Sequence, residues 1–205
     1  AWSVMAKKEF PKYANCISMA LTPMVLTGRL IKEEHPGSLV AFIGPCAAKK
    51  LEASRKSVRS EVDFVLTFEE VMGMFEAKEV DLDTIEPTAG MTEASGDGRG
   101  FAISGGVAGA VVEAIKNRYP ELEVKVEKAE GLNNCRKMML LAKAGKYNGY
   151  LLEGMACPGG CVGGAGTVQP IAKSTAAVEK AKKDSKRARS YESDYVSILP
   201  KLEEE

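Results

Sequence analysis

This chain of 205 residues has one histidine, no net charge and no long apolar run, and these absences exclude several classes of function. There is one histidine, and 28 Lys and Arg residues balance 28 Asp and Glu residues, so the formal net charge is zero. A neutral chain lacks the positive field that attracts nucleic acids or membrane surfaces, and we expect neither partner. No apolar run approaches the roughly 18 to 20 residues that span a bilayer, and the N-terminus shows no signal pattern. These features predict a cytoplasmic protein.

Short apolar runs alternate with segments of helical periodicity, and 45% of the residues are hydrophobic. The expected strands are residues 38–43, 62–67, 124–126 and 150–152, and the expected helices are residues 13–34 (interrupted by Pro23), 68–77, 107–117 and 132–144. Residues 83–100 have the composition of a loop, and residues 172–199 are predicted to be mainly a charged surface helix. Strands that alternate with helices at this spacing favour parallel pairing through crossover helices. We therefore predict an α/β fold, with a mostly parallel sheet of about four strands, helices on both faces and a C-terminal helical tail.

Three of the five cysteines lie directly after predicted strands. Cys157 and Cys161 belong to the glycine-rich stretch EGMACPGGCVGGAGTVQP, and Cys46 belongs to GPCAAKKLE. An odd number of cysteines does not suit a disulfide framework, and reduced thiols or metal thiolates are the better interpretation. An iron–sulfur cubane needs thiolates that converge within a few Å, and glycines remove side chains that would obstruct their approach. The alternative is a glycine-rich loop with incidental cysteines, since buried cysteine is common.

Both stretches resemble signatures of the [FeFe]-hydrogenases. Gly44–Glu52 is similar to the family's second signature, Met-Pro-Cys-x-x-Lys-x-x-Glu. Glu153–Pro170 is similar to the third, Glu-x-Met-Ala-Cys-x-x-Gly-Cys, with its glycine-rich continuation. Similarity also extends to three further segments, Asn15–Pro23, Phe101–Val107 and Gly131-Leu132. The resemblance implies that residues 1–170 are the C-terminal lobe of the family's catalytic domain, truncated at its N-terminus, and that residues 171–205 are a helical tail.

The resemblance also implies a metal cofactor, the H-cluster, in which a [4Fe–4S] cubane is joined through a cysteine thiolate to a two-iron subcluster. Cys46 and Cys157 would ligate the cubane, and Cys161 would ligate it while bridging to the two-iron unit. Lys49 would hydrogen-bond the distal cyanide of that unit, because a charge-assisted bond to an anion is stronger than a neutral one.

Three further residues match family positions around the cofactor. Met155 would pack beside the two-iron unit, where a soft thioether fills irregular space. Ser18 matches the proton-relay serine, and Phe101 matches an aromatic residue outside the ligands. For Ser18 the alternative is a helix serine bonded to the backbone. Cys16 and Cys135 match no family ligand and are predicted to be small apolar core residues on helices, while His35, in a predicted turn, is expected to be solvated.

The chain departs from the family in two respects. The first signature, Thr-Ser-Cys-Cys-Pro-x-Trp, is absent, and Ala1-Trp2 would fit directly behind its Cys-Cys-Pro. Gly44 stands where the family has Met, and Met24 where the prototypical enzymes have Gln. We therefore expect a fragment that holds three of the four cubane cysteines, lacks an intact H-cluster and is inactive alone, with a smaller residue at Gly44 that opens space beside the two-iron unit.

Three functions follow from the resemblance. The parent protein is expected to reduce protons reversibly to hydrogen, with the N-terminal half of the same catalytic domain and a ferredoxin-type electron donor as partners. The substitution at Gly44 also fits a hydrogen or redox sensor that uses the same cluster. The third alternative is a simple module that binds a [4Fe–4S] cluster or zinc through the three cysteines.

Overall fold

The computed structural model describes residues 1–86, 88 and 93–200. These residues form two compact units, and each is described by itself. The first unit takes residues 1–18, 93–163 and 169–196, and the second takes residues 19–86, 88, 164–168 and 197–200. Among the described residues, no helix combines the length and apolar character needed to cross a membrane.

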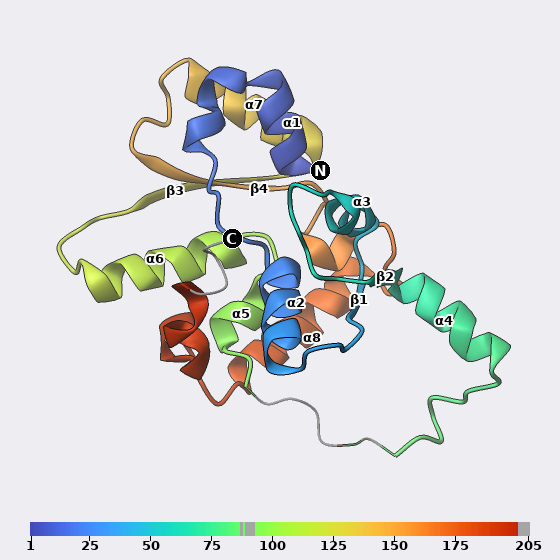
Figure 1. The fold of residues 1–205 in the computed structure, drawn as a ribbon. Helices are drawn as coiled ribbons and strands as arrows, with labels where there is room; N and C mark the ends of the chain where they lie inside the picture. Colours follow the sequence, from blue (N-terminus) through green and yellow to red (C-terminus); the bar gives the residue numbers. More distant parts are fainter. Residues whose placement is uncertain (87, 89–92, 201–205) are drawn as a thin grey trace. The chain divides into compact units, whose positions relative to one another are not determined.

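The second unit is built on two parallel strands. In chain order it contains α2 (Pro23–Glu34), β1 (Ala41–Gly44), α3 (Ala48–Ser54), β2 (Phe64–Thr67) and α4 (Phe68–Ala77) (Figure 1). The strands pair from Ala41 opposite Phe64 to Gly44 opposite Thr67. Pro23 begins α2 rather than interrupting a longer helix, because the missing N–H of proline costs nothing in the first turn. A capping box begins α4: the Thr67 hydroxyl accepts a bond from the Glu70 amide, and the Glu70 carboxylate accepts one from the Thr67 amide.

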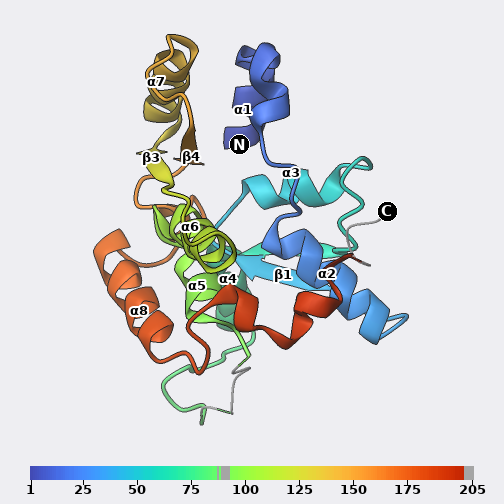
Figure 2. The same cartoon turned by 90° about the vertical axis from the view of Figure 1, so that its left-hand side faces the viewer.

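The first unit is built on a second parallel pair. Its elements are α1 (Trp2–Glu9), a 3₁₀ helix (Pro11–Cys16), α5 (Gly96–Gly100), α6 (Gly106–Arg118), β3 (Lys125–Glu130), α7 (Leu132–Lys143), β4 (Tyr150–Met155), a 3₁₀ turn (Cys161–Gly163), α8 (Ile171–Lys183) and two short 3₁₀ segments (Ser190–Glu192 and Asp194–Ser197). The strands pair from Lys125 opposite Tyr150 to Glu130 opposite Met155. Helix α7 lies on one side of this pair and α6 on the other (Figures 1 and 2), and α1 packs against α7.

The segment after α8 is bound to α5. The Asp97 side chain is buried, and its carboxylate accepts a bond of 3.0 Å from the Ser190 amide and one of 3.4 Å from the Arg189 guanidinium. The Gly96 amide also donates to the carbonyl of Arg187 over 2.8 Å. Residues 96–100 were predicted to be loop but form a short helix, because the Ser95 hydroxyl caps it at the Gly98 amide. Residues 87 and 89–92 of the predicted loop, and residues 201–205 of the predicted tail, lie outside the described residues.

The predicted α/β class and its parallel pairing are confirmed. Within the described part of the chain, however, the four strands form two separate pairs rather than one sheet. Each pair is a complete strand–helix–strand crossover, β1–α3–β2 and β3–α7–β4, so neither needs a strand from the other unit. The first strand was expected to be buried, yet Ile43 is 50% exposed. The domain boundary after Pro170 stays a prediction.

Candidate functional site

Cys46 lies at the carboxyl end of β1, between that strand and α3. Its carbonyl accepts a bond of 3.2 Å from the amide of Lys49, which lies in the first turn of α3. The Cys46 side chain is half-buried. The preceding carbonyl, on Pro45, accepts a bond of 2.9 Å from the Gly166 amide. Because Gly166 also accepts from the Glu69 amide over 3.2 Å, it links the residue before Cys46 to the start of α4.

Lys49, three residues after Cys46, is held by a carboxylate. Its Nζ lies 2.8 Å from Oε2 of Glu52, and both side chains are largely covered, with 20% and 25% of their surfaces exposed. The other oxygen of Glu52 accepts a bond from the Thr22 hydroxyl. An ammonium group has three donors. The pairing with Glu52 fixes the position of Lys49 and still allows it to bind a further anion.

Gly44 does not open space as expected. A Cβ atom built on Gly44 would lie 2.8 Å from the ring of Phe42, two residues earlier on β1. The Phe42 ring therefore fills the volume where the resemblance placed a methionine side chain. Met24, the other departure from the family, is buried in α2 with 4% of its surface exposed.

Cys157 and Cys161 lie in the loop that leaves β4. Two glycines between them have left-handed backbone conformations, with φ of 76° at Gly159 and 94° at Gly160. A Cβ on Gly160 would lie 2.7 Å from the backbone nitrogen of Ser104. The loop's own path therefore requires these glycines, quite apart from any approach to a cofactor.

The loop is bonded to the residues that precede α6. The Ser104 amide donates to the Gly159 carbonyl over 3.1 Å, and the Val162 amide donates to the Ala102 carbonyl over 3.1 Å. Phe101 lies at the start of this bonded segment and is half-buried, and Met155 is the last residue of β4. The first unit thus gathers Phe101, Met155, Cys157 and Cys161 on neighbouring segments.

A buried carboxylate that sequence reasoning missed holds this end of β4. Glu153 is 7% exposed, and its two oxygens accept bonds from the Gly105 amide and, over 2.7 Å, from the Ala108 amide at the start of α6. A carboxylate at a helix N-terminus is stabilised by the unpaired amides there. The available signal was its place as the first residue of the third signature, four residues before Cys157, but sequence reasoning assigned it no role.

Trp2, which the sequence analysis placed behind the first signature, makes a contact that the sequence did not reveal. A Cβ on Gly154 would lie 2.4 Å from Cε2 of Trp2, so the indole rests directly on the backbone of β4. The glycine makes this approach possible, and Trp2 covers the strand that leads to Cys157.

The remaining candidates lie elsewhere. Ser18 is exposed and follows the 3₁₀ helix, so it is not a helix serine. Cys16 was predicted in the core but is exposed, because the segment between Pro11 and Pro23 does not form an α-helix.

Cys135 is fully buried on α7 with its sulfur 3.4 Å from the carbonyls of Ala129 and Met155, and burial raises the pKa of its thiol. A neutral buried thiol suits a core residue. His35 is exposed, as predicted.

Cys46 belongs to the second unit, whereas Cys157 and Cys161 belong to the first. Within the described ranges 1–86, 88 and 93–200, no three His, Cys, Asp or Glu side chains are gathered as for a metal ion. The convergence of all three cysteines on one cluster therefore stays a prediction.

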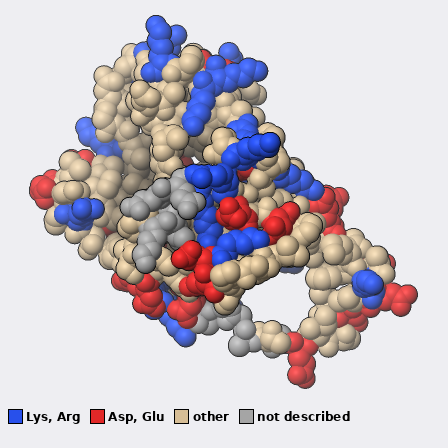
Figure 3. Space-filling view, in the orientation of Figure 1, with Lys and Arg blue, Asp and Glu red and all other residues tan. Residues whose placement is uncertain are grey.

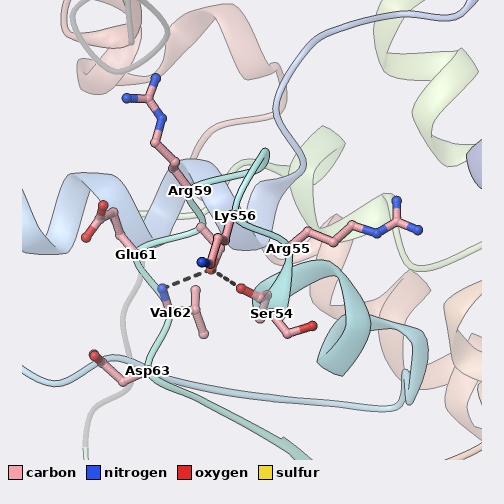
Figure 4. A pocket seen from close by; sticks show the side chains of 9 residues that line it. Ser54, Arg55, Lys56, Arg59, Glu61, Val62 and Asp63 are labelled. Carbon is pink, nitrogen blue, oxygen red and sulfur yellow. Dashed lines mark hydrogen bonds between the residues drawn. The ribbon is translucent and has the colours of Figure 1, made fainter.

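A shallow pocket of about 420 Å³ lies in the second unit, away from Cys46, between the end of α3 and the start of β2. Figure 4 shows the side chains of Arg55 and Arg59 pointing in different directions, so they do not converge on an anion. The Ser60 hydroxyl, which also lines the pocket, donates to the Ala53 carbonyl and accepts from the Val62 amide. On the face drawn in Figure 3, basic and acidic side chains lie next to one another.

The comparisons with known proteins agree on one family. The model of the family "Iron only hydrogenase large subunit, C-terminal domain" matches residues 1–165. The chain is 26% identical over 206 residues to iron hydrogenase 1 of Clostridium pasteurianum, covering 80% of this chain and 36% of that protein. It is 31% identical over 203 residues to a probable cytosolic Fe-S cluster assembly factor of Drosophila virilis, covering 75% of this chain and 43% of that protein. The chain thus spans less than half the length of these two curated relatives.

The solved structures extend the likeness to the fold. The structure resembles the [FeFe]-hydrogenase HydA1 from Chlamydomonas reinhardtii with a TM-score of 0.69 and 20% sequence identity, covering 98% of this chain and 69% of that chain. An identity this low supports the fold alone.

Proposed function

Since this chain belongs to the family of the iron-only hydrogenase large subunit, C-terminal domain, we propose that it supplies Cys46, Cys157 and Cys161 as thiolate ligands of an iron–sulfur cluster. The observation that carries the proposal is that both cysteine segments begin at the carboxyl end of a parallel strand, β1 or β4. Ligands in α/β proteins are bound at such strand ends.

The donor chemistry fits this group. Thiolates are the usual ligands of iron–sulfur clusters, and the side chains of Cys46, Cys157 and Cys161 are all at least partly exposed. Of the three residues between Cys157 and Cys161, Gly159 and Gly160 have no side chain, and only Pro158 carries one. When bound, a [4Fe–4S] cluster joined to a two-iron subcluster would supply the electron transfer and the hydrogen chemistry.

The chain's own residues would orient and shield that group. Lys49, fixed by Glu52, would present an ammonium group to an anionic ligand three residues from Cys46. Met155 and Phe101 would pack around the cofactor without offering protons, and Ser18 would relay protons towards it.

For the parent protein we propose reversible reduction of protons to hydrogen in the cytoplasm. The N-terminal part of the catalytic domain would supply the remaining cubane ligand, and a ferredoxin-type protein would supply the electrons. The 26% identity to an iron hydrogenase supports this activity.

Serine variants of the full-length protein test the ligand set. Iron content and the electron paramagnetic resonance spectrum are measured after anaerobic reconstitution. C46S, C157S and C161S are each expected to lose most of the roughly four irons of the cubane. C16S, an exposed cysteine outside the set, is the matched control and should retain them. Full iron content in all three variants, or loss in C16S as well, would reject the assignment.

A second candidate is a role in cluster assembly or cluster storage without hydrogen turnover. The 31% identity to an Fe-S cluster assembly factor favours it. The simple module that binds a [4Fe–4S] cluster or zinc and the hydrogen or redox sensor both stay predictions beside it. Hydrogen production from a strong reductant by the matured full-length protein discriminates: turnover supports the hydrogenase, and an intact cluster without turnover supports the second candidate.

A further inference from the structure

The loop between Cys157 and Cys161 has few backbone donors, and its glycine amides have partners. Pro158 has no N–H group. The Gly160 amide donates to the carbonyl of Cys157 over 3.1 Å. The Gly159 amide donates to the carboxylate of Glu130. Both glycine amides of the loop are therefore engaged inside the first unit.

Glu130 reaches the loop from the neighbouring strand. It is the last residue of β3 and lies opposite Met155, the last residue of β4. The next amide, on Gly131, donates to the Met155 carbonyl over 2.9 Å, which fixes the two strand ends together. The carboxylate thus bonds to a loop that begins beside it, although the two bonded residues are 29 positions apart in the sequence.

We infer that Glu130 is a positioning residue for the cysteine loop and lowers the reduction potential of the cluster that the loop binds. The inference deepens the proposed function and rests on it for the cluster. Glu130 fixes the Gly159 peptide by a charge-assisted bond, which is stronger than a bond to a neutral acceptor.

Two physical effects act on the potential in the same direction. Amide hydrogen bonds to the sulfurs of a cluster raise its potential, and nearby negative charge lowers it. Glu130 occupies an amide that could otherwise turn to a cluster sulfur, and it adds a carboxylate next to the loop. Each effect makes the reduced cluster harder to form.

The positioning role is tested first without metal, by amide hydrogen exchange of Gly159 in the whole 205-residue chain. In E130A the exchange of Gly159 is expected to accelerate roughly tenfold, because a bond to a charged acceptor is lost. In E130Q the side-chain amide oxygen still accepts the bond, so most of the protection should return. E127A is the matched control: Glu127 is on the same strand, and its carboxylate accepts a bond from the adjacent Lys128 amide rather than from the loop. Equal exchange in the parent chain and in E130A would overturn the positioning role.

The effect on potential is tested by redox titration of the reconstituted full-length protein, followed by electron paramagnetic resonance. The midpoint should become more positive in E130Q, which loses the charge, and more positive still in E130A, which also releases the amide. The midpoint potential of E127A should lie closer to that of the parent protein than the midpoint potential of either Glu130 variant does. Identical midpoints in all four proteins would overturn the tuning role. If the parent protein binds no iron, the proposed function fails, while the exchange measurement still decides whether Glu130 fixes the loop.

Discussion

The segment after β1 and the segment after β4 both present cysteines at the carboxyl end of a parallel strand, but they are held by different kinds of contact. At Cys46 the chain turns at once into α3, and the nearby cation is fixed by Glu52 within the same helix. At Cys157 the chain enters a glycine loop, and two carboxylates from β3 and β4, Glu130 and Glu153, hold the loop and the strand before it.

The difference shows how much each segment depends on distant residues. The bonds that orient Lys49 and Cys46 span three residues, and longer-range bonds join Glu52 to Thr22 and Pro45 to Gly166. Glu153 instead bonds to residues 45 and 48 positions away. We expect a change at Glu153 to act on the Cys157 loop and a change at Gly166 to act on the Cys46 segment, and variants in each unit can test that contrast.

Glu153→Ala should have the largest effect. Two hydrogen bonds to a buried carboxylate are lost and two amides at the start of α6 lose their partner, so the first unit should be destabilised by about 3 kcal/mol. Urea unfolding followed by the fluorescence of Trp2, the only tryptophan, measures this unit, because the indole rests on β4.

Two comparisons sharpen the result. Glu121→Ala, at an exposed turn before β3, should change the urea midpoint of the Trp2 fluorescence little. Amide exchange in α4 of the second unit should also stay unchanged in Glu153→Ala. An equal loss of protection in α4 would contradict the contrast, since it would mean that the two segments share their stability.

Gly166→Ala is the corresponding change in the second unit and should cost about 2 kcal/mol. A Cβ at this position would lie 2.4 Å from Cβ of Thr67, which is part of the capping box and cannot swing away cheaply. Exchange of α4 amides should accelerate while Trp2 fluorescence stays unchanged. Gly73→Ala is the matched control in α4, where the added methyl meets no atom within 4 Å, and it should stabilise the helix by about 1 kcal/mol.

The sequence predicted the elements whose signals are local. Helix α4 was placed at its observed bounds, because the pattern after a strand-like run is carried by adjacent residues. The short helix α5 was missed, since five glycine-rich residues have no periodicity to detect. The 3₁₀ helix that ends at Cys16 was mistaken for part of an α-helix, because periodic apolar residues outweighed the proline that begins it, Pro11.

The residues of the candidate site also differ in whether the sequence alone could reveal them. The cysteines and Lys49 were found because their spacing within a motif is itself the signal. The supporting roles of Glu130 and Glu153 were missed, because their bonding partners are distant in sequence. Glu153 belongs to the third signature, but the motif alone does not reveal what its carboxylate bonds to, and Glu130 belongs to no motif. The pairing of strands two by two also depends on tertiary packing, which hydrophobic pattern alone does not encode.

The smallest expected effects are those of pH, and they act in opposite directions on the two units. In the second unit, the bond from Lys32, with one from the Val40 amide, lowers the pKa of Asp63, and the bond from Lys50, with one from the Thr67 amide, lowers the pKa of Glu70. A carboxylate with a lowered folded pKa contributes stability above its unfolded pKa, near 4. That contribution is lost as the pH falls through the folded value. Exchange protection in α4, corrected for the intrinsic rate, should therefore fall below about pH 4.

In the first unit the sensitive group is Cys135, whose pKa is raised by burial. The folded chain holds the thiol proton of Cys135 more tightly than the unfolded chain does. The protonated thiol therefore contributes its full share of the folding stability below the unfolded pKa, near 8.5, and this share is lost as the pH rises above that value. The urea midpoint reported by Trp2 should fall on the alkaline side, and Cys135→Ala should remove that dependence. Asp63→Asn and Glu70→Gln should instead reduce the loss of exchange protection in α4 at acid pH and leave the alkaline change in the urea midpoint as it is. If acid weakened both units equally in the parent chain, these carboxylates would not be the cause, because both belong to the second unit.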